Sequence, residues 1–121
     1  MRAFLILAAA GLGTLAAGVA IAPRDAARAQ EGTVSTGQAL AFDRAKGNCL
    51  ACHTMTGSDV PSNVGPQLSG MKARFPDRKE LAAIIYDEET RNPQTVMPAF
   101  GKNLILSDKD INEIVDFLYT L

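Results

Sequence analysis

The sequence has only one histidine, His53, and only two cysteines, Cys49 and Cys52, all in the short stretch "CLACH". A structural zinc site needs four ligands, usually from two C-x-x-C pairs or from one pair and two histidines. The chain has no second pair and no second histidine, which disfavours zinc. A thioredoxin-like redox pair lies in a βαβ unit. No alternating strand pattern precedes Cys49, which disfavours a thioredoxin-like site as well.

The sequence also lacks a basic tract, a basic stripe, an internal repeat and any alternating strand pattern. The formal net charge of the chain is −1. Nucleic acid and anionic membrane surfaces are therefore poor candidates as partners. Without strand patterns, the hydrophobic periodicity predicts an all-α fold of about three to five short helices.

The N-terminal segment has the pattern of a secretory signal peptide. Arg2 gives a short basic start, and every residue from Ala3 to Ala22 is apolar, Gly or Thr. Pro23 interrupts this run, and "ARA" at 27–29 fits a small-x-small cleavage site. The alternative is an uncleaved membrane anchor, because the apolar run is about long enough to span a bilayer.

We expect cleavage after Ala29, so that residues 1–29 are removed and a single domain of residues 30–121 remains. That domain keeps nine basic and twelve acidic residues, a net charge of −3. Export places it in the periplasm, with no membrane contact after cleavage. A domain of this size buries a limited apolar core and often needs a disulfide, a metal or a cofactor as reinforcement.

Three helices are predicted from capping residues and apolar spacing. The first begins near Thr36 and runs toward the cysteines. The second has Asp77 as its N-cap, with Glu80 three residues later in a capping-box-like pair. The third has Ser107 as its N-cap, followed by an apolar face at i, i+3, i+4 and i+7 that starts at Ile111.

Three further segments carry no helix pattern. Residues 30–36 are polar and are expected to be a flexible lead-in. Residues 54–70 and about 88–106 are rich in Gly, Pro and small polar residues and are expected to be long loops. Structureless loops of that length are unusual in a small helical domain unless they serve a function, such as enclosing a ligand.

The remaining interpretation of the C-x-x-C-H motif is that it attaches c-type haem. The two thiols form thioethers with the two haem vinyl groups, and one turn of chain matches the distance between those groups. His53 then supplies the proximal nitrogen to the iron. The spacing therefore predicts one haem c bound covalently through Cys49 and Cys52, with His53 as a metal ligand.

Methionine is the remaining choice for the sixth iron ligand, because the chain has no second histidine. Met1 leaves with the signal peptide, and Met55 follows the histidine too closely to reach the opposite face. Met97 lies in the long loop before the last helix, where Pro98 holds it extended, and we predict that it is the ligand. Met71 is predicted instead to fill space in the core.

An iron with histidine and methionine on its two faces has no open position for oxygen or substrate. Thioether ligation favours the ferrous state. Such a centre transfers single electrons, and no catalytic residue is predicted. A haem-based ligand sensor would require the methionine to dissociate easily.

The motifs "CLACH", "VGPQLSG" and "MPAFG" together resemble class I cytochromes c over residues 30–121. The resemblance implies an all-α fold around one covalent haem. It implies that the carbonyl of Pro66 accepts the Nδ1 proton of His53 and that Arg74 lies near a haem propionate. It also implies that Phe42 and Phe117 lie where the first and last helices cross.

The run "NPQTVMPAFGKN" followed by "LSDKDI" resembles more narrowly the SoxX family, the monohaem subunit of the SoxXA cytochrome of sulfur oxidation. That resemblance implies a heterodimer with a SoxA-like haem subunit, at which thiosulfate is joined oxidatively to a cysteine of a carrier protein. This chain would pass the released electrons to a soluble cytochrome c, and its own haem would not contact substrate. The alternative is a free-standing class I cytochrome c that carries electrons between respiratory complexes.

Overall fold

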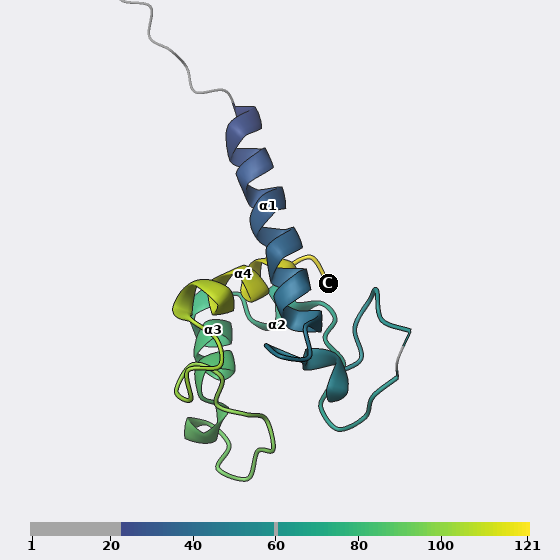
Figure 1. Cartoon of the computed structure of the whole chain (residues 1–121), viewed down its shortest axis with the longest axis vertical. Helices are drawn as coiled ribbons and strands as arrows, with labels where there is room; N and C mark the ends of the chain where they lie inside the picture. The colour runs from purple at the N-terminus through teal and green to yellow at the C-terminus, as the bar shows by residue number, and fades with distance from the viewer. Residues whose placement is uncertain (1–22, 60) are drawn as a thin grey trace, which may run out of the picture.

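The computed structural model describes residues 23–59 and 61–121, so most of the predicted signal peptide lies outside the described residues (Figure 1). The elements in chain order are α1 (Pro23–Phe42), the 3-10 helix η1 (Cys49–Ala51), α2 (Met71–Arg74), α3 (Arg78–Tyr86), the 3-10 helix η2 (Glu88–Thr90) and α4 (Asp108–Leu118). Within the described residues, β pairing is limited to an isolated bridge between Met55 and Leu68. The predicted all-α fold is confirmed.

Helices α1 and α4 cross at close range, and this crossing forms the centre of the fold (Figure 1). At Gly37 the backbone of α1 lies directly on the carbonyl of Glu113, and a Cβ there would come within 2.9 Å of the Ile114 nitrogen. One turn further on, the rings of Phe42 and Phe117 meet edge to face, with centroids 5.9 Å apart. Only a glycine lets the two backbones approach this closely.

The predicted start of the first helix is wrong. Residues 30–36 were expected to be a flexible lead-in, but they lie inside α1, which already begins at Pro23. Their hydroxyl groups donate back to carbonyls of the same helix: Thr33 to Gln30, and Ser35 and Thr36 both to Gly32. These bonds satisfy the polar side chains within the helix, so the polar composition did not end it.

The starts of the two later helices are as predicted. Asp77 caps α3 by accepting a hydrogen bond from the nitrogen of Lys79 at 2.8 Å. Ser107 and Asp110 form a reciprocal capping box at the start of α4. Both caps use side chains close in sequence, which explains why local patterns identified them.

The hydrophobic core lies between α1, α3 and α4 and includes Met55, Leu68 and Met71 from the first long loop and α2. The buried face of α4 contains the predicted apolar residues, Ile111, Ile114, Val115, Phe117 and Leu118. Of the helices in residues 23–59 and 61–121, none is both long enough and apolar enough to cross a membrane.

Candidate functional site

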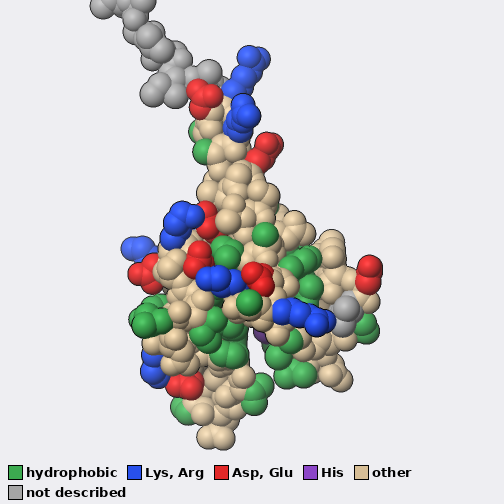
Figure 2. Space-filling model, in the orientation of Figure 1, with side chains coloured by type: hydrophobic (Ala, Val, Ile, Leu, Met, Phe, Trp, Pro, Cys, Tyr) green, Lys and Arg blue, Asp and Glu red, His purple; other side chains and the backbone are tan. Residues whose placement is uncertain are grey.

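A cavity of about 690 Å³ opens between the two long loops, and its walls are mainly apolar. Figure 2 shows the hollow between two lobes of the surface. Side chains from η1, both long loops, α3 and α4 line it. The predicted site residues that line it are Cys49, Cys52, His53, Pro66, Arg74 and Met97. The long loops therefore enclose one space, and the predicted residues meet there.

The two cysteines lie on one helical turn at the edge of the cavity. The nitrogens of Cys52 and His53 both donate to the carbonyl of Cys49, at 3.2 and 2.9 Å, and this closes the turn. Both thiols are free and half-buried. Burial raises the pKa of the Cys49 thiol to about 11. A redox-active thiol needs a lowered pKa, so this environment does not favour thioredoxin-like chemistry.

His53 has one ring nitrogen fixed by the backbone. Its Nδ1 lies 2.7 Å from the carbonyl oxygen of Pro66. A carbonyl can only accept a hydrogen bond, so Nδ1 carries a proton, and in the neutral ring Nε2 then keeps its lone pair. A histidine held in this way presents Nε2 as a metal ligand of fixed orientation.

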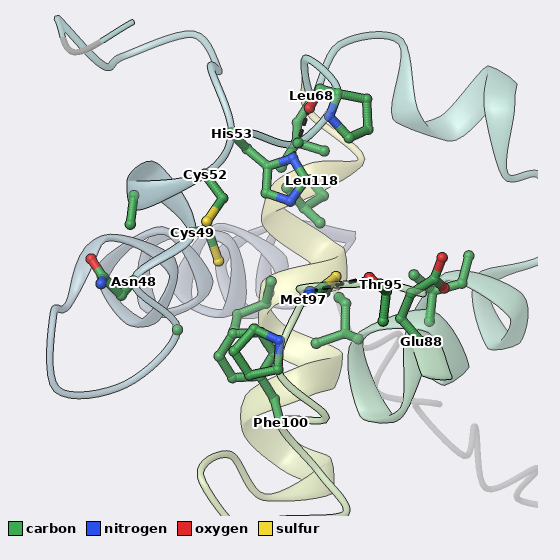
Figure 3. Close-up of a pocket in the computed structure, with 18 of the residues that line it drawn as sticks. Asn48, Cys49, Cys52, His53, Leu68, Glu88, Thr95, Met97, Phe100 and Leu118 are labelled. Atoms are coloured by element: carbon green, nitrogen blue, oxygen red, sulfur yellow. Dashed lines mark hydrogen bonds between the residues drawn. The ribbon is translucent and has the colours of Figure 1, made fainter. Parts of the chain in front are cut away.

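Met97 reaches the cavity from the second long loop. In Figure 3 it and His53 come from separate segments of chain, with the two cysteines beside the histidine. The nitrogen of Met97 donates to the hydroxyl of Thr95 at 3.1 Å, and the side chain is half-buried. Because Pro98 follows, the backbone at Met97 is restricted to extended conformations. This arrangement leaves the thioether among the lining groups and fixes the main chain behind it.

The loop that carries Met97 is closed at its neck. The carbonyl of Tyr86 accepts hydrogen bonds from the nitrogens of Gly101 and Lys102, at 3.1 and 3.3 Å. The ammonium of Lys102 pairs with Asp87 at 3.1 Å and with Glu89 at 3.0 Å. These contacts join the two ends of the loop, so it cannot open without breaking them.

Arg74 also lines the cavity, and its guanidinium holds the first long loop. Its Nη1 donates to the carbonyl of Gln67 at 2.9 Å and to that of Ser69 at 3.3 Å, with the sulfur of Met71 also at 3.3 Å. Arg74 is exposed. Arg74 thus places a cation at the cavity, as contact with a propionate would require.

The sequence interpretation missed several residues that shape the site. Glu88 and Arg91 form an ion pair in the cavity wall, and Lys102 closes the Met97 loop. Arg91 lies three residues after Glu88, a spacing that one helical turn brings into contact, and the turn at η2 forms this ion pair. Lys102 lies 13 residues after Glu89, so no local pattern connects them, and they meet only because the loop closes.

The donor set and the shape of the cavity fit a covalently attached haem. Two free thiols, an imidazole with an available Nε2 and a thioether line one apolar space. When bound, such a group supplies a one-electron iron centre. The residues of this chain would hold it, orient its histidine ligand and exclude water through the apolar walls.

Two comparisons with known proteins bear on this site. The sequence model of the Cytochrome c family matches residues 34–121, well over half of the chain. An uncharacterized lipoprotein of Aquifex aeolicus (strain VF5) is 33% identical over 75 residues. The match covers 61% of this chain and 36% of that protein, so the chain spans only about a third of this relative's length.

Proposed function

This chain belongs to the cytochrome c family, and we propose that it is the electron-transfer subunit of a periplasmic complex that conjugates thiosulfate to a carrier-protein cysteine. The family establishes an electron-transfer protein of the class I all-α fold with haem c attached through Cys49 and Cys52. The observation that carries the function is the meeting of His53 and Met97 at one cavity. With both as ligands, the iron has no open position and exchanges single electrons.

The narrower assignment to a SoxX-like subunit is supported by the run "NPQTVMPAFGKN" and the helix that follows it. In the structure this run is the second half of the Met97 loop and ends at its neck. Its resemblance to the SoxX family implies a SoxA-like haem partner in a heterodimer and a soluble cytochrome c as electron acceptor. The substrate reaction would then occur at the partner, and this chain would accept the electrons.

An apolar rim beside the cavity supports electron exchange with a docked protein. Val64 is 59% exposed and Val96 is 77% exposed, and both line the cavity. A contiguous exposed apolar patch rimmed by polar residues is typical of an interaction site, and these two side chains would contribute to such a patch at the opening. The two residues come from the two different long loops, so a partner seated there would contact both sides of the opening.

The complex can be tested by affinity purification of the tagged full chain from its native host. We expect a larger haem protein to co-purify, and deletion of the gene to abolish growth on thiosulfate. The free-standing cytochrome c predicts instead that the chain purifies alone as a monomer that reduces a terminal oxidase. Recovery of a lone chain together with normal growth on thiosulfate would contradict the proposal.

Export can be tested on the same preparation. Cleavage after Ala29 predicts a periplasmic protein whose first residue is Gln30, measurable by intact mass and N-terminal sequencing. A chain recovered from the membrane with residues 1–29 attached would support the uncleaved anchor instead.

A further inference from the structure

A single carboxylate lies in the wall of the cavity. Glu88 is only 7% exposed, and it is the one acidic side chain among the described residues that line this space. Burial of an ionised carboxylate is unfavourable unless a cation compensates it. Figure 3 places Glu88 on the same side of the pocket as Thr95 and Met97. A charge therefore sits in the cavity wall on the methionine side.

Arg91 compensates this charge with two hydrogen bonds. Its Nη2 donates to Oε1 of Glu88 at 2.7 Å, and its Nε donates to Oε2 at 3.1 Å. Arg91 also lines the cavity, and its side chain is 59% exposed. The hydrogen bonds to Glu88 raise the pKa of Arg91 above its ordinary value, with a smaller contribution from Glu80. The guanidinium of Arg91 thus offsets a negative charge on Glu88 through this two-point contact.

We propose that Glu88 and Arg91 form a compensated charge pair in which each residue cancels the effect of the other on the reduction potential of the iron centre. This inference rests on the proposed electron-transfer site. Reduction changes the charge of the iron by one. An unpaired charge in the nearby, partly apolar wall therefore changes the free energy of that reduction. Uncompensated Arg91 would favour the ferrous state, and uncompensated Glu88 would favour the ferric state. Neither residue is a predicted iron ligand, and each acts on the iron only through its charge.

The test compares reduction potentials of the purified holoprotein at pH 8, where a carboxyl group of ordinary pKa is ionised. Glu88→Gln is expected to raise the potential and Arg91→Gln to lower it. Each change should alter the equilibrium constant for reduction about tenfold, equivalent to about 59 mV for one electron. The double variant should return to within about twofold of the parent, because it removes both charges.

Three further variants separate charge from structure. Arg91→Lys keeps the charge but cannot form the two-point contact, and it should keep the parent potential. Lys109 and Glu113 form a matched control pair on α4: Glu113 is also buried, at 8% exposed, and its ion pair is also 2.7 Å long, but neither residue lines the cavity. Lys109→Gln and Glu113→Gln should leave the potential within about twofold.

Shifts of the same sign for Glu88→Gln and Arg91→Gln would overturn the proposal. It would also fail if neither variant moved the potential, or if the control pair moved it equally. Each variant is first checked for a low-spin spectrum in the visible range. If the parent itself lacks covalent haem or a low-spin spectrum, the proposed electron-transfer site has failed, which is a separate result from an unchanged potential.

Discussion

Gly65 lies directly against the imidazole ring of His53. A Cβ at this position would lie 2.6 Å from Nδ1 and closer still to Cε1. The nitrogen of Gly65 donates to the carbonyl of Cys52 at 2.7 Å, and the next residue, Pro66, accepts from the ring. The backbone of residues 65–66 therefore fixes both the plane of the ring and the proton on Nδ1.

Replacement of Gly65 by alanine should push the His53 ring out of position. We expect the unfolding free energy of the holoprotein to fall by about 1–3 kcal/mol, as for other overpacked sites, and the low-spin spectrum to weaken. The control is Gly70→Ala, at φ +59° with open space around it. That variant should lose about 1–2 kcal/mol through backbone strain alone and keep its spectrum. Identical spectra for both variants would contradict this role.

Met97→Ala should open the sixth position of the iron. We expect the ferric protein to become largely high-spin at neutral pH and to bind added imidazole at least tenfold more tightly, measured by visible titration. Met71→Leu is the control, because Met71 is only 2% exposed in the core and the substitution conserves volume. If Met97→Ala stayed low-spin without added ligand, the predicted ligation would be wrong.

The neck of the Met97 loop should control how readily the methionine is displaced. Lys102 bridges Asp87 and Glu89, and those hydrogen bonds raise its pKa. We expect Lys102→Gln to increase the affinity of the ferric protein for imidazole about threefold, because the loop opens more easily. Lys102→Arg should retain the parent affinity, and Lys109→Gln, on α4, should have no effect. Since exposed ion pairs are screened by salt, the difference between Lys102→Gln and the parent should shrink at high ionic strength.

Gly37 should be the least replaceable glycine of α1. Gly37→Ala places a methyl group into the Glu113 backbone of α4 and should lower the unfolding free energy by about 1–3 kcal/mol. Gly32 in the same helix has nothing within 4 Å of a built Cβ. Gly32→Ala should therefore cause no loss, and it should raise the unfolding free energy by at most about 0.5–1 kcal/mol, the value for a helix interior. Denaturant unfolding of both holoproteins tests the contrast, and equal effects would refute it.

The capping box of α4 should make stability depend on acid pH. Hydrogen bonds from Ser107 hold the pKa of Asp110 below its usual value. A carboxyl whose pKa is lowered by folding contributes stability above its unfolded pKa and loses it as pH falls through the folded pKa. The deficit of Asp110→Asn relative to the parent should therefore be full at pH 7 and shrink below about pH 4. A deficit that is the same at pH 7 and pH 3 would contradict the prediction.

Local chemistry made part of the fold predictable from the sequence. The caps at Asp77 and Ser107 act over two or three residues, and the buried face of α4 follows one helical period, so both could be identified from the sequence. The start of α1 could not, because hydroxyl groups that usually favour turns formed hydrogen bonds inside the helix instead. Polar composition alone does not distinguish these two outcomes.

The sequence by itself determined the chemistry of the site. The spacing of Cys49, Cys52 and His53 specifies haem attachment, and the scarcity of other ligands leaves Met97 as the expected sixth one. Tertiary structure alone decided what surrounds that chemistry: the glycine against the histidine ring, the closed neck of the methionine loop, and the place of the Glu88–Arg91 pair in the cavity wall. The physical reason is range. Attachment depends on atoms a single turn apart, whereas the surroundings depend on contacts that exist only after the two long loops have closed over one cavity.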